Sequence, residues 1–81
     1  EVNIYPNPSD GNFEIKYTSG AELKMIIYNS IGQRVVKENL LPGINQKITM
    51  EKANLASGVY SVIFFDGEKA VKKEKIVVIK S

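Results

Sequence analysis

The feature that most constrains this fold is the regular recurrence of turn-forming residues between short stretches that alternate apolar and polar side chains. Turn signals occur at Ser9–Asn12, Thr18–Gly20, Asn29–Gln33, Leu41–Gly43 and Asp66–Gly67. Short alternating strands at such spacing are typical of an all-β sandwich rather than of a parallel sheet with crossover helices. We therefore predict an antiparallel β-sandwich.

The alternation predicts about seven strands. They are expected at Val2–Tyr5, Asn12–Tyr17, Glu22–Tyr28, Arg34–Glu38, Gln46–Glu51, Gly58–Phe65 and Ala70–Lys80. A single helical turn at Lys52–Ser57 is the one alternative, and Gly58 would end it. With 81 residues, we expect residues 1–81 to form a single domain.

Composition removes several classes of function. The chain has no cysteine and no histidine, so thiolate metal sites, cysteine nucleophiles and histidine acid–base chemistry are excluded. The net charge of +2 is too small and too interrupted for a nucleic-acid footprint, and no apolar run approaches the roughly 20 residues of a membrane-spanning helix. We expect no enzymatic activity and no cofactor. Because the chain begins with Glu1, we also expect it to be a piece of a longer protein.

The most distinctive local motif is Tyr5-Pro6-Asn7-Pro8, followed by a turn and a strand. The two prolines fix two φ angles and favour extended conformations at Tyr5 and Asn7. Gly11 in the following turn can adopt a positive φ without steric cost. The segment therefore predicts a rigid corner between two strands, with a structural role.

The stretch Leu55–Val62 predicts a second structural motif. Leu55 is placed to cap the core, and Gly58 lets the chain turn into the next strand. The Tyr60 ring is expected to be buried with its hydroxyl bonded to the preceding loop, which is the logic of the tyrosine corner in sandwich domains. With Tyr60 inward, three apolar residues point outward, and that face is either covered or a contact surface. These are Val59, Ile63 and Phe65.

Three chemical alternatives have weaker support. The carboxylates Asp10, Glu14, Asp66 and Glu68 sit in turns or at outward positions, where solvated surface explains them better than acid–base catalysis. Asp10 with Asn7 and Asn12 offers oxygen ligands for calcium, but turn formation accounts for the same residues. Phe13, Tyr17, Tyr28 and Tyr60 could form a carbohydrate platform, although aromatic residues at strand spacing are more often core.

The last predicted strand combines lysines with a short apolar run, Ile76–Ile79. Lysines on an exposed edge strand prevent edge-to-edge pairing, which is the simpler interpretation. Alternatively, another protein reads this strand, because an extended basic strand suits capture by strand addition. The residues themselves favour the first interpretation.

Taken together, these motifs resemble a known family, the C-terminal sorting domain (type A) of cargo proteins of the type IX (Por) secretion system. The resemblance runs from about Val2 to Lys80. It rests on four stretches in order: Tyr5–Ile15, Ile27–Val35, Leu55–Val62 and Gly67–Lys80.

The resemblance implies an immunoglobulin-like sandwich that acts as a secretion signal. It would direct an upstream exported cargo in cis through the periplasm and the outer-membrane translocon of a Gram-negative bacterium. The implied partners are translocon and shuttle proteins and a cell-surface sortase, which cleaves the domain so that the cargo is released or attached to lipopolysaccharide. An accessory adhesion or carbohydrate-binding module is the alternative.

Gly58 and Tyr60 resemble the family's glycine–tyrosine pair, and Lys75 followed by Ile76–Val78 resembles its terminal-strand lysine, whereas the longer lysine run at Lys72-Lys73 departs from the family pattern. The expected translocon recognition residues are Lys72, Lys73, Lys75, Ile76, Val77, Val78 and Lys80. The expected structural residues are Tyr5, Pro6, Pro8, Gly11, Gly32, Gly58 and Tyr60.

Overall fold

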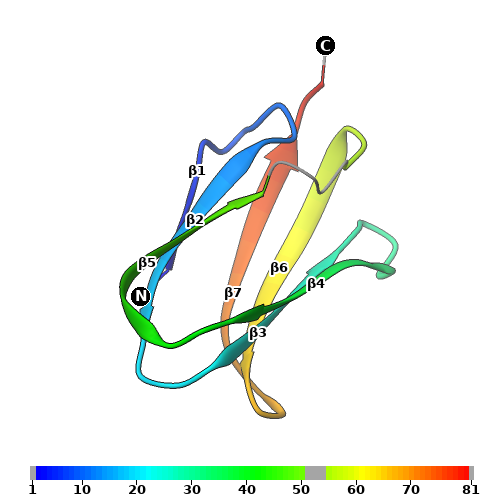
Figure 1. Cartoon of the computed structure of the whole chain (residues 1–81). Coiled ribbons are helices and arrows are strands. Elements are labelled where there is room, and N and C mark those ends of the chain that lie inside the picture. The colour runs from blue at the N-terminus through cyan, green and yellow to red at the C-terminus, as the bar shows by residue number, and fades with distance from the viewer. Residues whose placement is uncertain (1, 51–54, 81) are drawn as a thin grey trace.

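A computed structural model describes residues 2–50 and 55–80, which form seven strands in two antiparallel sheets packed face to face (Figure 1). The strands are β1 (Val2–Tyr5), β2 (Phe13–Ser19), β3 (Leu23–Tyr28), β4 (Arg34–Leu40), β5 (Gly43–Met50), β6 (Gly58–Asp66) and β7 (Lys69–Val78). One sheet has the order β1-β2-β5 and the other β4-β3-β6-β7. The predicted immunoglobulin-like sandwich is confirmed.

The described residues contain no helix, so none of them forms a helix suited to crossing a membrane. The predicted alternative of a helical turn at Lys52–Ser57 falls partly on residues outside the described ranges.

The core forms from the inward positions of both sheets, as period-two alternation requires. Alternate side chains of β2 face those of β3 and β6 across the sandwich, and all of them are buried. They are Phe13, Ile15 and Tyr17 from β2, Leu23, Met25 and Ile27 from β3, and Tyr60, Val62 and Phe64 from β6. Leu55 caps this core as predicted, and Ile76 and Val78 bring β7 into it.

Several strand boundaries differ from the sequence prediction, and two of these differences have a clear cause in the pairing of the strands. β4 continues past Glu38 to Leu40, because the fully buried Leu40 side chain holds the strand end against the core opposite Leu23. β5 begins at Gly43 rather than Gln46, since Gly43 pairs with Ser19 beyond a bulge in β5. Leu41 and Pro42 therefore carry the chain from one sheet to the other.

Two tyrosine hydroxyls tie loops to the sandwich. Tyr60 donates to the carbonyl of Ala56 at 2.6 Å, which confirms the predicted tyrosine corner. Tyr17 makes an equivalent bond to the carbonyl of Leu41, also at 2.6 Å, which the sequence did not predict. The second bond anchors the crossing between the sheets at the end of β4.

The predicted tight connection between β3 and β4 is also present. Gly32 has a φ of 85°, in the region that favours glycine. The Asn29 side-chain oxygen accepts hydrogen bonds from the backbone N–H groups of Ile31 at 3.2 Å and Gln33 at 2.8 Å. This Asx arrangement explains why Asn29 opens the turn.

Candidate functional site

The terminal strand β7 lies at the edge of the four-stranded sheet, paired on one side with β6. Ile76 and Val78 are 2% and 1% exposed, so these two members of the predicted recognition set are part of the core. Val77, between them, is half-buried and points to the outer face of the sheet opposite Val59. One side of this strand is therefore anchored in the core, and the other side lies on the outer face of the sheet.

The lysines of β7 are divided between the two faces of its sheet. Lys73 and Lys75 are exposed, stand opposite Ile63 and Ser61 of β6, and so lie on the outer face. Lys72 stands opposite the buried Phe64 and therefore lies toward the inner side, at the margin of the sandwich. A bulge between Phe64 and Phe65 shifts the register at this point.

Lys72 has an acidic neighbour within β7. Its Nζ lies 3.3 Å from an Oε of Glu74, with side-chain exposures of 47% and 36%. Such solvent-exposed pairs contribute little, about 0–1 kcal/mol. The ion pair with Glu74 is therefore too weak to prevent the Lys72 ammonium from binding a partner.

The Tyr-Pro-Asn-Pro corner lies alongside the far end of β7, where the loop after β1 meets the end of the last strand (Figure 1). The Asn7 side chain donates from Nδ2 to the carbonyl of Lys75 at 2.9 Å, and its Oδ1 accepts from the N–H of Val77 at 3.0 Å. The Ser9 backbone N–H donates to the carbonyl of Val77 at 2.9 Å, and the Ser9 carbonyl accepts from the N–H of Ile79 at 2.7 Å. Four hydrogen bonds therefore cover the outer edge of β7 from Lys75 to Ile79.

We call this contact the β7 latch: Asn7 and Ser9 paired with Lys75, Val77 and Ile79. The peptide bonds before Pro6 and Pro8 are both cis. The sequence prediction gave the corner a structural role but did not foresee this partner. The contact joins residues about 70 positions apart, and no local pattern in the sequence signals it.

Lys80, the last predicted recognition residue, follows β7 and is exposed. Its backbone N–H donates to the Ser57 hydroxyl at 2.9 Å. A Cβ added at Gly11 would lie 2.8 Å from Cε of Lys80, so the lysine stem crosses directly over this glycine. With its φ of 110°, Gly11 is required here by the backbone conformation, whereas the flexible end of the Lys80 side chain can move aside for an added Cβ.

The residues of the alternative chemical sites are engaged in structural contacts instead. The Asp10 carboxylate accepts from the N–H of Asn12 at 3.1 Å, and the Asn7 side chain is engaged in the β7 latch. The Glu14 carboxylate lies 3.6 Å from the Lys47 ammonium. Among the described residues, no group of three acidic, histidine or cysteine side chains is placed to hold a metal ion.

The proposed aromatic platform does not form. Phe13, Tyr17 and Tyr60 are core residues with exposures of 2%, 3% and 6%, whereas Tyr28 stands on the opposite side of its sheet. A carbohydrate platform needs several rings on one open surface. These four rings are therefore not available together.

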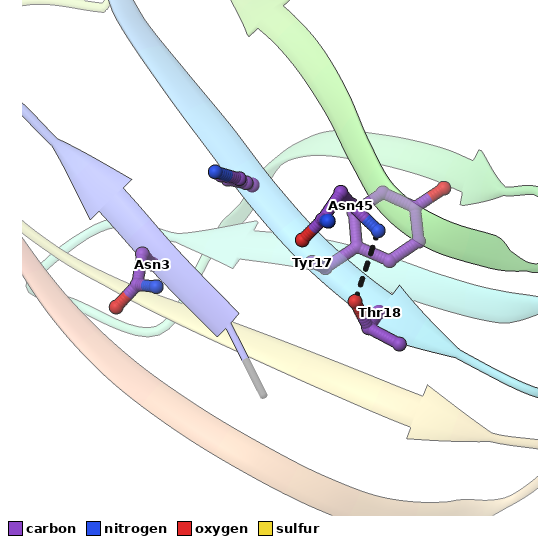
Figure 2. Close-up of a pocket in the computed structure, with 5 residues that line it drawn as sticks. Asn3, Tyr17, Thr18 and Asn45 are labelled. Atoms are coloured by element: carbon purple, nitrogen blue, oxygen red, sulfur yellow. Dashed lines mark hydrogen bonds between the residues drawn. The ribbon is translucent and has the colours of Figure 1, made fainter.

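A small hollow of about 150 Å³ lies on the three-stranded sheet near Asn45 (Figure 2). Its lining residues are Asn3, Lys16, Tyr17, Thr18 and Asn45. The Asn45 N–H donates to the Thr18 hydroxyl at 3.0 Å, and Asn45 has a positive φ of 53°. The lining contains no carboxylate and no paired nucleophile and base, so we assign it no chemistry.

Comparison with known proteins identifies the family of this small sandwich. Residues 3–80 match the family model of the secretion system C-terminal sorting domain, almost the whole chain, and the protein belongs to this family. No curated protein was found to match the chain. The domain is thus a type IX (Por) secretion signal, which directs an exported cargo through the outer-membrane translocon to release or attachment at the cell surface. The family is a sorting signal rather than a catalytic one, and no finding supports the adhesion alternative.

Proposed function

We propose that β7 and Lys80, two residues after its end, are the part of this sorting domain that the secretion machinery recognises. The observation that carries the proposal is the position of β7 as an edge strand that is anchored in the core by Ile76 and Val78 while its lysines remain exposed. A strand held in this way presents fixed charges at low entropic cost to a partner. The proposed recognition residues are Lys72, Lys73, Lys75, Ile76, Val77, Val78 and Lys80.

These residues have two roles in the proposal. Lys72, Lys73, Lys75, Val77 and Lys80 are accessible in the folded domain and contact the partner directly. Ile76 and Val78 set the register of the strand and thereby position the lysines. Direct contact with these two residues would require β7 to leave the core.

The proposed partners follow from the family. They are the translocon and its shuttle proteins at the outer membrane, and afterwards a cell-surface sortase, with a cargo domain upstream in cis. The cargo reaches these partners through the periplasm and ends secreted or attached to lipopolysaccharide on the surface. We further propose that residues 1–81 fold as one autonomous domain without enzymatic activity.

The test is export of a reporter fused to residues 1–81 in a bacterium with an intact type IX system and in a translocon mutant. Deleting residues 72–81 is a poor probe, because it also removes Ile76 and Val78 from the core. The double variant Lys73→Glu/Lys75→Glu keeps the core and reverses two exposed charges. Lys16→Glu, on the outer face of the other sheet, is the matched control.

We expect translocon-dependent export with the native sequence and with Lys16→Glu, and strongly reduced export with the double variant. Urea unfolding of the purified domains checks that all three have the same stability. Normal export of the double variant would refute the assignment of recognition to β7, although the domain would remain a sorting signal.

A further inference from the structure

The two outer faces of the sandwich differ in character. The outer face of the three-stranded sheet is polar, with Lys16 opposite Lys47 and Glu14 opposite Thr49, as expected of a sheet that faces water. The outer face of the four-stranded sheet is largely apolar at its centre. Its apolar side chains are Ile26, Tyr28, Ile63 and Phe65 on the two central strands, and Val59 and Val77 beyond the end of β3; Ser61 and Lys24 stand on the same face.

No element formed by the described residues covers this apolar face, because all seven strands belong to the two sheets. Val59 is 45% exposed, whereas Ile26 is only 8% exposed because its neighbours surround it. The apolar centre is therefore flush with the sheet and does not protrude. The sequence prediction that Val59, Ile63 and Phe65 point outward is confirmed.

Basic residues border the apolar centre on both sides, because the strand register places them on the two edge strands, β4 and β7. One row runs straight across all four strands as Lys37, Ile26, Ile63 and Lys73. The next row runs as Arg34, Tyr28, Ser61 and Lys75. The backbone positions that carry the edge cations of each row are about 14 Å apart, three strand spacings.

Charge on this face has a single sign. The register places five basic side chains on it, namely Lys24, Arg34, Lys37, Lys73 and Lys75, and places no carboxylate of the described strands there. The acidic residues of these strands, Glu38, Glu74 and Asp66, lie on the inner side: Glu38 and Glu74 stand opposite Met25 and Val62, and Asp66 lines a hollow beside Phe64. An apolar centre between two basic borders is complementary to an apolar protein ridge flanked by carboxylates.

From this complementarity we propose that the outer face of the four-stranded sheet docks a partner protein that presents an apolar ridge bordered by acidic side chains. The proposal rests on the function assigned above, since it extends the recognition site from β7 across β6 and β3 to β4. Lys73 and Lys75 form one border of the site, and Lys37 and Arg34 form the other.

Two other occupants fit less well. A second copy of this chain would bring two sets of five cations face to face, which is unfavourable. A lipid surface requires apolar side chains that stand out beyond the lysines, whereas the centre here is flush, with Ile26 almost covered. The face therefore matches an anionic protein better than either.

The test measures separately how the basic border on β4, the apolar centre and the lysines of β7 contribute to export. Lys37→Glu reverses a charge on β4, and Ile63→Thr makes the centre polar while keeping a β-branched side chain. The double variant Lys73→Glu/Lys75→Glu tests β7 alone, and Lys16→Glu is again the control on the other sheet. Export of the reporter fusion is the readout, with urea unfolding of each purified domain beside it.

We expect Lys37→Glu and Ile63→Thr each to lower export about tenfold, because reversing a complementary charge slows association and losing an apolar contact speeds dissociation. The urea concentration at the midpoint of unfolding should be the same for each of these variants as for the control Lys16→Glu. If Ile63→Thr unfolds the domain, Val59→Ser, at an already exposed position, replaces it as the probe of the centre.

The possible failures are distinguishable. If only the β7 double variant loses export, recognition is confined to β7 and this inference is wrong, while the proposed function stands. If no variant loses export, both are wrong. Binding to vesicles of phosphatidylcholine with phosphatidylglycerol that Lys37→Glu abolishes would assign the face to lipid instead. A dimer in sedimentation velocity that Lys37→Glu dissociates would assign it to a second copy.

Discussion

Replacing Asn7 by alanine tests the β7 latch directly. Asn7 makes two hydrogen bonds to β7, at 2.9 Å to the Lys75 carbonyl and at 3.0 Å from the Val77 N–H. A hydrogen bond of this kind contributes about 0.5–1.5 kcal/mol net. Both bonds lie at the surface, where water replaces the lost partner, so we expect the lower half of the summed range, about 1–2 kcal/mol.

Urea unfolding gives the global measurement. With a slope of about 1 kcal/mol per molar urea for a small domain, the midpoint should fall by about 1–2 M. The local measurement is amide hydrogen exchange at Val77, whose N–H bonds to the Asn7 side chain. We expect exchange at Val77 to accelerate more than at Ile79, because the Ile79 N–H bonds to the Ser9 backbone, which the substitution leaves in place.

Asn7→Asp is the matched variant. The aspartate keeps an acceptor for the Val77 N–H but loses the donor to the Lys75 carbonyl, and it places two oxygens side by side. Val77 should therefore stay protected in Asn7→Asp while the domain is still destabilised. Unchanged exchange at Val77 in Asn7→Ala would show that the side chain does not hold the edge of β7, and the latch would be refuted.

Three further predictions concern the sandwich itself. Phe64→Ala empties a fully buried core position and should lower the free energy of unfolding by about 3–5 kcal/mol, measured by urea denaturation. Burial raises the pKa of Tyr17, so the folded state keeps this proton to higher pH than the unfolded state and stability should fall as the pH rises above 10.0. In Tyr17→Phe the free energy of unfolding should fall less steeply above pH 10.0. The variant also loses the hydrogen bond to Leu41, which should cost about 0.5–1.5 kcal/mol of stability at neutral pH. An unchanged dependence of stability on pH above 10.0 would contradict this prediction. Gly32→Ala, at a φ of 85°, should cost about 1–2 kcal/mol, whereas Gly20→Ala, with nothing within 4 Å of an added Cβ and no positive φ, should cost much less; equal effects in thermal denaturation would contradict the turn assignment.

Local patterns in the sequence predicted the strands and their faces well. The alternation Tyr60, Val62, Phe64 identified the buried side of β6, and Tyr60 and Gly32 were assigned to their correct motifs. These features depend on neighbours a few residues away, which the sequence displays directly.

What the sequence did not reveal depends on pairing between distant segments. The extension of β4 to Leu40 and the early start of β5 at Gly43 follow from partners in β3 and β2. The Tyr17–Leu41 bond and the β7 latch likewise join segments that no local rule connects. The recognition residues came from a family resemblance, and the structure adds which of them are accessible.

The β7 latch also limits how a partner can engage the terminal strand. Strand addition requires unpaired backbone N–H and C=O groups along an edge. Asn7 and Ser9 occupy these groups from Lys75 to Ile79, whereas no described residue pairs with the outer edge of β7 before Lys75. A partner strand is therefore restricted to the stretch Lys69–Glu74 unless the corner detaches.

Beyond Lys75, a partner can contact only the side chains of this segment while Asn7 and Ser9 remain hydrogen-bonded to its backbone. Lys75 and Val77 point to the outer face, the same surface that carries Ile63 and Lys37. The corner thus directs recognition of this part of β7 away from its backbone edge and onto the face of the sheet. If Asn7→Ala opens the edge without impairing export, a partner that docks on the face explains the result, since such a partner does not need the edge. If opening the edge instead increases export, strand addition past Lys75 would be the mode of recognition, and docking on the face would not account for the result.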